Sequence, residues 1–500
     1  MRWRAGIERL TCATAAMVLL ASANARGAGK PVYGGTLRVE LRASGVTWNP
    51  AKWKPGTPEF SSNERLGELV FERLVSLDNY GRFQPQLATE WSRDAAGKRW
   101  VFTLRPGVKF SDGSPLTSGD VTSALQGLLP RGMQISATTG GVVIQATSAA
   151  TDLLEMLSYG PYFVYKDAGQ SVPLGTGPFV VEKEDPAGQR LRLRYNELCW
   201  SGRPFVDAIE VTLGVPPLRA LLDVQLGRAD LAELSADTAR RAQQTKTKLW
   251  ASAPVVLYAL QFSESARSES EQDARAALEA SLDREAMARV LLQKQAEPAA
   301  AFLPQWLSGY AFLFPMETNV EKAKALRAKL PVSAAGAGQP LRIGVETGND
   351  LARLLAERAV VNARAAGLTL SVLTTKAGRA GDGNGKSTDL DAQLVAWRYS
   401  SLSPRETLED LASAWKVDAA EGVPADGEAR YAWEKRMMDE RNLLPLVAVP
   451  DYAAVDARVR NWAPAAWGEW RLADVWLEAA ENSAGGANGM GSTGATGAKP

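Results

Sequence analysis

The amino-acid sequence predicts an α/β protein of two lobes joined by a hinge. Uninterrupted apolar strands at residues 255–262 and 444–450 lie far apart in the chain, and we interpret them as its two crossings between lobes. The first lobe is then discontinuous and the second continuous. Of the 500 residues, 45% are hydrophobic and 23% charged, an ordinary composition for a globular chain with room for two lobes.

The first 25 residues are typical of a secretory signal peptide. Three arginines precede a short apolar run at residues 13–21, and a small-x-small triplet follows at residues 23–25. The run is too short to span a bilayer. We therefore expect residues 1–25 to be removed and the soluble mature protein to be periplasmic or otherwise extracytoplasmic. Residues 483–500, rich in Gly, Ala and Ser, predict a disordered tail.

The composition excludes several kinds of chemistry. A formal net charge of +1 provides no field that would attract nucleic acid, and the absence of histidine rules out Ser-His-Asp catalysis and imidazole metal ligands. Of the 2 cysteines, Cys12 lies in the signal peptide, so Cys199 would be alone, and we expect it to be buried and inert. We expect no enzymatic activity, no cofactor and no metal.

Residues 98–121 carry the most specific local pattern. Alternating apolar residues predict a half-buried strand from Arg99, and Asp112-Gly113 predicts a tight turn. A helix should follow, because Thr117 is a good N-cap and the side chain of Asp120, three residues later, can accept the backbone N–H of Thr117 to complete a capping box.

The other elements follow in chain order. Strands are predicted at residues 34–41, 179–181, 367–370 and 392–397, and helices at residues 68–75 and 350–364. Gly175 and Gly177 predict a close backbone approach before the strand at 179. The helix at 350–364 should bury Leu351, Leu354, Leu355 and Val361.

The order of a strand, the segment Gly-Val-Lys-Phe-Ser-Asp-Gly-Ser-Pro-Leu-Thr at 107–117 and a capped helix resembles the signature of the family 5 solute-binding proteins. These proteins are the extracytoplasmic receptors of peptide, nickel and related ABC importers. Segments 173–179, 196–211 and 275–285 are similar to the same family, in the same order. The resemblance weakens over residues 129–172, where this chain has only a short passage rich in Gly, Ser and Thr.

The resemblance implies a two-lobed periplasmic-binding-protein type II fold, with a hinge and an extra N-terminal subdomain. Residues 31–256 plus 450–482 would form lobe I, with a shortened insertion at 129–172, and residues 257–449 would form lobe II. Such a protein acts as a monomer, closes on a ligand in the interlobe cleft and delivers it to an inner-membrane ABC permease.

The strand end at Trp397 departs from the pattern of peptide-binding relatives. Those relatives carry an aspartate shortly after the tryptophan, which pairs with the peptide ammonium, whereas Ser400 or Ser401 stands there in this chain. An anionic or neutral polar ligand fits better, with Arg398 pairing bidentately with a carboxylate. The alternative, that Arg398 is a solvated surface residue and the serines cap a turn, remains equally open.

The loop at residues 54–60 would line the same cleft, Tyr258 could point into it and Trp306 could close it. The candidate ligand-binding residues are therefore Gly56, Thr57, Glu59, Phe60, Tyr258, Trp306, Trp397, Arg398, Tyr399, Ser400 and Ser401.

We expect a peptide or peptide-like small solute as the ligand. One alternative is a receptor of the same fold that regulates a membrane sensor. Another is a P-loop nucleotide-binding enzyme, because residues 380–387 fit a relaxed P-loop pattern. The predicted strand ends near residue 375, too early for a working P-loop, and a glycine-rich hairpin loop is the better interpretation.

Overall fold

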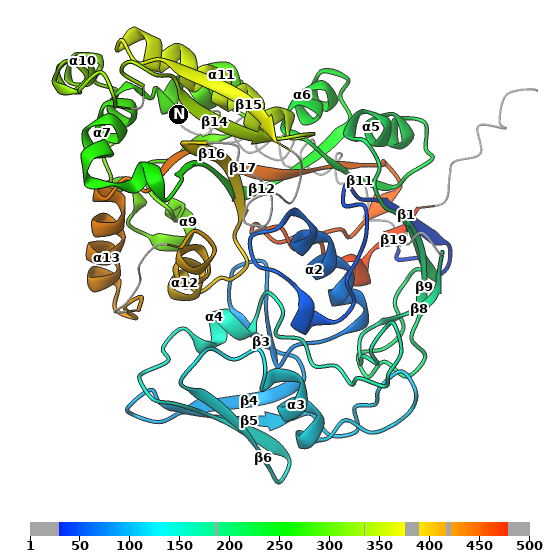
Figure 1. Ribbon diagram of the computed structural model, residues 1–500. Helices are drawn as coiled ribbons and strands as arrows, with labels where there is room; N and C mark the ends of the chain where they lie inside the picture. The colour runs from blue at the N-terminus through cyan, green and yellow to red at the C-terminus, as the bar shows by residue number, and fades with distance from the viewer. Residues whose placement is uncertain (1–29, 186–188, 335, 376–389, 417–421, 479–500) are drawn as a thin grey trace, which may run out of the picture.

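The computed structural model describes residues 30–185, 189–334, 336–375, 390–416 and 422–478. One mixed sheet of 11 strands runs through the molecule (Figure 1). Ten strands follow one path, and β13 (Glu297–Pro298) pairs with β17 (Leu443–Val455) beside it. The spatial order is β15 (Leu370–Thr375), β14 (Leu341–Glu346), β16 (Ala392–Arg398), β12 (Lys248–Phe262), β17 (Leu443–Val455), β11 (Leu231–Leu234), β1 (Thr36–Glu40), β10 (Ala208–Thr212), β9 (Arg190–Tyr195) and β8 (Phe179–Glu184).

The two central strands, β12 and β17, pair antiparallel and belong to both halves of the sheet. The second half of β12 also pairs with β16, whereas the second half of β17 pairs with β11. Their register shifts between Ala251 and Val256 and again after Tyr258. We call the half built on β1 and β8–β11 lobe I, and the half built on β14–β16 lobe II. The predicted boundaries, 256/257 and 449/450, fall inside β12 and β17 and remain predictions.

Helices cover both halves of the sheet. In lobe I, α2 (Pro58–Val70) packs near β8, whereas α5 (Pro217–Gln225) and α6 (Ala236–Gln244) share an apolar core with lobe II. That core includes Leu221 of α5 and Leu355 of α11 (Asp350–Ala365). The helices of lobe II are α7 (Gln272–Ser281), α8 (Arg284–Ala286), α9 (Gln305–Ser308), α10 (Val320–Lys329), α11 (Asp350–Ala365), α12 (Pro404–Ala414) and α13 (Gly427–Asp439).

An N-terminal subdomain with its own apolar core lies at the bottom of Figure 1. Its antiparallel sheet has the order β4 (Ala88–Arg93), β5 (Arg99–Leu104), β7 (Gly141–Ala146) and β6 (Met133–Thr138), with α3 (Ser118–Leu125) against β6 and β7 and α4 (Leu153–Leu157) nearby. Two short ladders, β2 (Val75–Leu77) with β3 (Phe83–Pro85) and β18 (Val459–Arg460) with β19 (Trp476–Leu477), complete the described strands.

The local prediction at residues 98–121 is confirmed. Thr117 caps α3: its hydroxyl accepts the Asp120 N–H at 3.2 Å, and Asp120 accepts the Thr117 N–H at 2.9 Å. Asp112 accepts the Ser114 N–H at 2.8 Å, and Gly113 has a φ of +88°. These contacts join neighbours in sequence, so the sequence alone determines them.

The predicted close approach at Gly175 is also confirmed. A Cβ atom there would lie 1.9 Å from the carbonyl oxygen of Val70, at the end of α2.

Two local predictions are wrong. The helix expected at 68–75 is instead α2, which ends at Val70. Helix α11 is present, but it buries Ala352, Ala356, Ala359 and Ala363 with Leu355, whereas Leu354 and Val361 are 38% and 53% exposed. Small alanines let α11 lie close to the sheet, so its inner face is less hydrophobic than expected.

The predicted signal peptide with Cys12, the C-terminal tail and the P-loop-like residues 380–387 lie outside the described residues. Cys199 is buried, as expected, and burial raises the pKa of its thiol. Among the described helices, none has both the length and the apolar composition needed to cross a bilayer.

Candidate functional site

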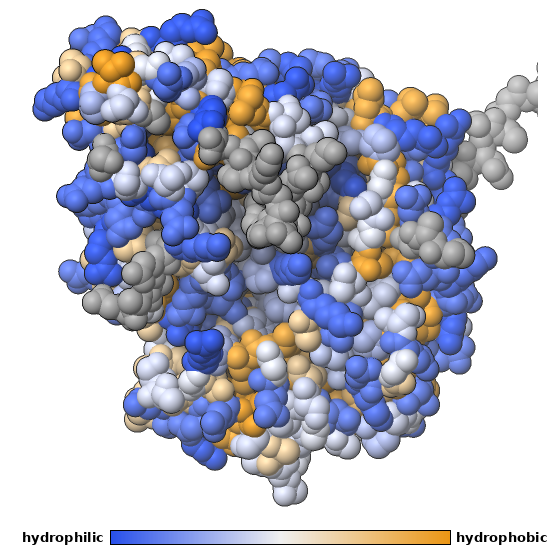
Figure 2. All heavy atoms as spheres, viewed as in Figure 1, coloured by the Kyte–Doolittle hydropathy of each residue, from blue (hydrophilic) through white to orange (hydrophobic). Residues whose placement is uncertain are grey.

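A cleft of about 1120 Å³ lies where β12 and β17 pass between the lobes. Lobe I contributes the segment after β1, the start of α2, the start of α5 and the β11–α6 junction. Lobe II contributes β16 and the first turns of α11, and the two central strands form the floor. In Figure 2, orange side chains gather over α5 and over the N-terminal subdomain, whereas hydrophilic colours dominate the region between them.

A buried ion-pair network forms part of this floor. Arg398, the last residue of β16, pairs with Asp451 of β17 through Nη1–Oδ1 at 2.9 Å and Nη2–Oδ2 at 2.7 Å. Arg65 of α2 contacts Asp451 at 2.6 Å and Glu233 of β11 at 3.3 Å. Two cations from opposite lobes therefore share one carboxylate at the crossing.

The network determines the charge of its members. Burial alone would raise the pKa of Asp451, but the Arg398 and Arg65 guanidinium groups hold it below its usual range. The Asp451 carboxylate in turn raises the pKa of Arg398 against the effect of burial. Asp451 and Arg398 are thus both charged, and the floor of the cleft carries fixed charges of both signs.

Four of the eleven predicted site residues line the cleft: Gly56, Glu59, Tyr258 and Arg398. Gly56 accepts the backbone N–H of Arg398 at 3.2 Å, and thus links the lobe I loop to the end of β16. Arg398 is 4% exposed, so it is not a solvated surface residue. Its carboxylate partner is Asp451 of its own chain, where a ligand carboxylate was expected.

The structure puts several other predicted residues elsewhere. Phe60 is fully buried against Trp53, because it lies on the inner face of α2. Thr57 is the N-cap residue of α2, with its hydroxyl donating to the Lys54 carbonyl at 3.0 Å. Trp306 is 36% exposed, and its indole N–H donates to the Pro254 carbonyl on β12 at 2.8 Å. None of these three is part of the cleft lining.

Trp397 and Tyr399 belong to the core of lobe II. The Trp397 ring packs edge-on against Trp415, and the Tyr399 hydroxyl donates to the Phe302 carbonyl at 2.8 Å. Strand alternation explains this placement, because residues on either side of Arg398 point to the opposite face of the sheet.

Ser400 and Ser401 also face away from the cleft. The Ser400 hydroxyl donates to Asp410 at 3.0 Å, and the Ser401 hydroxyl donates to Glu406 of α12. Glu406 also accepts a hydrogen bond from Tyr162, which follows α4 in the N-terminal subdomain. The serines therefore help to hold α12 against the N-terminal subdomain.

A second contact joins the same two segments. Asp152, which precedes α4, pairs with Arg405 at 3.2 Å and accepts the Ser403 hydroxyl at the N-terminus of α12. Together with the Tyr162–Glu406 bond, it forms what we call the α12 contact. Burial, with the charge of Asp410 next, raises the pKa of Glu406 to about 8.

Sequence reasoning missed Arg42, Glu233 and Asp451, all of which line the cleft. Arg42 follows the opening strand, and Asp451 directly follows the predicted crossing at 444–450. A polar residue at the end of an apolar crossing strand was the available signal for Asp451, because such a residue emerges where the lobes meet.

One group of acids could in principle hold a cation. The carboxylates of Glu64, Glu68 and Glu469 lie within 4.8 Å of one another. Arg73 pairs with Glu64 at 2.7 Å, and Arg471 pairs with Glu469 at 2.9 Å. Burial and the neighbouring carboxylates raise the pKa of Glu68 well above its usual range. Arginines and a retained proton thus already neutralise this cluster, which is not part of the cleft lining.

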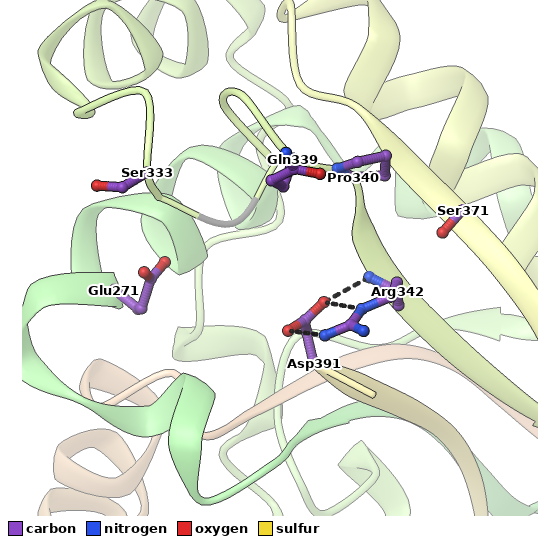
Figure 3. A pocket seen from close by; sticks show the side chains of 7 residues that line it. All are labelled: Glu271, Ser333, Gln339, Pro340, Arg342, Ser371 and Asp391. Atoms are coloured by element: carbon purple, nitrogen blue, oxygen red, sulfur yellow. Dashed lines mark hydrogen bonds and ion pairs between the residues drawn. The ribbon is translucent and has the colours of Figure 1, made fainter. Parts of the chain in front are cut away.

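A smaller pocket of about 470 Å³ lies on lobe II alone. Figure 3 shows Arg342 and Asp391 pointing toward each other inside it, with the Arg342 N–H donating to Asp391 at 2.8 Å. None of the predicted site residues lines this pocket. The interlobe cleft is therefore the better candidate for ligand binding.

The fold and cleft define a two-lobed binding protein of the periplasmic type II class. The family model described as "Bacterial extracellular solute-binding proteins, family 5 Middle" matches residues 82–418. The chain belongs to that family.

Known relatives support both assignments. The nickel-binding periplasmic protein of Escherichia coli K12 is 24% identical over 354 residues, which cover 63% of this chain and 67% of that protein. NikA of Brucella suis, solved with Fe(III)-EDTA, superimposes with a TM-score of 0.72 and 20% identity, covering 89% of this chain and 100% of that chain. AppA of Bacillus subtilis, solved with a nonapeptide, gives a TM-score of 0.70 and 16% identity, with coverages of 90% and 100%.

Proposed function

We propose that this chain is the extracytoplasmic solute-binding component of an ABC import system. It binds a peptide or peptide-like small solute in the interlobe cleft and delivers it to a membrane permease. The observation that carries the proposal is the cleft itself, which has about 1120 Å³ and is lined by both lobes at the strands that join them. Pockets that bury a small molecule usually have about 300–1,000 Å³, so a short peptide would fit.

The family supports the same role. Its members are extracellular solute-binding proteins, and relatives carry names such as nickel-binding and oligopeptide-binding protein. The arrangement also suits closure on a ligand, because β12 and β17 are the sheet strands shared by the lobes and their pairing is irregular near the crossing.

Thermal unfolding of residues 26–482 tests the proposal. The panel should contain di- to pentapeptides, N-blocked peptides, opines, glycans and anionic metabolites. A solute at one hundred times its dissociation constant adds about 2.7 kcal/mol to the free energy of unfolding and raises the midpoint.

A bulky side chain placed in the cleft tests whether the solute binds there. Ala396 lines the cleft, so Ala396→Trp should abolish stabilisation by the solute. Ala95→Trp, at an exposed turn of the N-terminal subdomain, is the matched control and should bind normally. A solute that stabilises Ala396→Trp as strongly as the unmodified protein binds elsewhere and contradicts the proposal.

A further inference from the structure

Two hydrogen-bond donors face the cleft without a protein partner among the described residues. One is the guanidinium group of Arg42, which follows β1 in lobe I. Its backbone N–H donates to Glu233 at 3.0 Å, but its exposed side chain makes no hydrogen bond or ion pair there. The other is the hydroxyl group of Tyr258 on β12, the one aromatic side chain among the described residues that line the cleft.

The charge of Arg42 influences Tyr258 and also the ion-pair network at the floor of the cleft. Burial raises the pKa of Tyr258, and the positive charge of Arg42 counteracts this effect. The same charge helps to lower the pKa of Asp451. The contacts agree with this, because the backbone N–H of Arg42 donates to Glu233, which pairs with Arg65 of the network, and Arg42 and Tyr258 both line the cleft.

Within the buried network the positive and negative charges are equal in number. Arg65 and Arg398 are balanced by Glu233 and Asp451, with which they form ion pairs. Arg42 adds a cation that forms no ion pair among the described residues, while the carboxylates of Glu59 and Asp237 also line the cleft. A guanidinium and a hydroxyl side by side can donate to both oxygens of one carboxylate, and the charged donor makes the stronger bond.

We propose that Arg42 and Tyr258 form an anchor for a carboxylate group of the solute, one donor coming from lobe I and the other from β12. The inference rests on the proposed solute-binding function and specifies the chemistry of its ligand. Glu346, Asp350 and Glu357 line the outer part of the cleft at the start of α11. Their charge disfavours solutes with several negative groups, so the ligand is a monocarboxylate or a zwitterion.

Matched pairs of solutes test the anchor. Each pair is a short peptide with a free C-terminal carboxylate and the same peptide as its amide, and titration calorimetry gives both dissociation constants. The free acid should bind about 10- to 100-fold more tightly than the amide, the range expected for a hydrogen bond to a charged group. Arg42→Gln should remove this preference, and Tyr258→Phe should reduce it several-fold.

The matched control is Arg240→Gln. Arg240 also lines the cleft, but its guanidinium already donates to the side chain of Gln293 at 2.6 Å. This variant should keep the preference for the free acid. Thermal midpoints without solute show whether each variant is folded.

Two results would overturn the anchor and leave the solute-binding function standing. One is an amide that binds as tightly as its acid, and the other is a preference that survives Arg42→Gln. If none of the pairs binds, 100 mM acetate used as the minimal carboxylate probe gives no stabilisation, and no solute of the thermal-unfolding panel raises the midpoint, both the anchor and the proposed function fail.

Discussion

Arg398 and Asp451 meet in two parallel contacts, Nη1–Oδ1 at 2.9 Å and Nη2–Oδ2 at 2.7 Å. The two residues are on strands that flank β12 on opposite sides, so their pairing spans the central strand of the sheet. A planar guanidinium paired bidentately with a carboxylate fixes the direction of both side chains. The pair therefore helps to define the geometry of the crossing.

Asp451→Ala should destabilise the protein by about 3–5 kcal/mol, because it leaves two buried arginines without their shared partner. Chemical unfolding measures the loss. Asp439→Ala breaks the exposed Lys435–Asp439 pair at 2.8 Å and should cost at most about 1 kcal/mol. Equal costs for the two variants would mean that the buried pair contributes no more than a surface one.

Gly56→Ala should separate the loop of lobe I from the end of β16. The φ of Gly56 is +78°, and a Cβ atom there would lie 2.2 Å from the ring of Trp397. Gly45→Ala is the control, because a Cβ atom at Gly45 has no neighbour within 4 Å. Unfolding and solute affinity should change in the first variant alone; unchanged affinity in Gly56→Ala would show that closure tolerates the added group.

Glu434 should make the protein less stable as the pH rises. Its carboxylate accepts the N–H groups of Phe302 and Leu303 at 2.7 and 3.1 Å and the Tyr310 hydroxyl at 2.8 Å, and burial raises its pKa to about 7. The folded state thus holds a proton that the unfolded state loses near pH 4.5. This stabilisation is complete below that pH and disappears as the pH rises through 7.

Glu434→Gln should therefore flatten the dependence of stability on pH between 5 and 8, measured by chemical unfolding. Glu428→Gln, at an exposed position of the same helix, should leave the dependence unchanged. If the curve of Glu434→Gln keeps the original slope, the titration belongs to other groups.

The α12 contact should weaken as the pH rises from about 4.5 to 8. Burial and the charge of Asp410 favour the protonated form of Glu406, and they outweigh the hydrogen bonds from Ser401 and Tyr162, which favour the carboxylate. Asp410, Asp152, Glu409, Arg405 and Tyr162 surround or influence this group. Small-angle scattering of the solute-free protein should show a larger radius of gyration at pH 9 than at pH 6. Glu406→Gln should show the same radius at both values; an increase as large as in the unmodified protein would exclude Glu406 as the cause.

The sequence predicted those parts of the fold that depend on neighbouring residues. The capping box of Thr117 and Asp120 and the turn at Asp112 are local, and the two crossing strands are long apolar runs. Helix α2 was missed because its buried residues include Asn63, Glu64 and Arg65, which obscure the hydrophobic period. Their burial is stable only with partners from distant segments, and no local pattern reveals such partners.

The candidate site was predictable only in part, for the same reason. Sequence reasoning identified Arg398 and Tyr258 as cleft residues, but the partner of Arg398 is 53 residues away. Asp451 reaches it only after β16 and β17 have both paired with β12. Whether the Arg42 side chain forms an ion pair could likewise not be predicted, because it depends on which side chains the fold brings beside it.

The central position of β17 has a consequence for the order in which the protein can be completed during synthesis. Strand β11 pairs with β1 on one side and needs residues 452–455 of β17 on the other. The core of lobe I also includes Trp470 and Val475. Nearly the whole chain must therefore leave the ribosome before the sheet of lobe I can be completed. The lobe whose synthesis begins first is thus the last to finish folding. Until then, the nascent chain carries an unpaired strand edge.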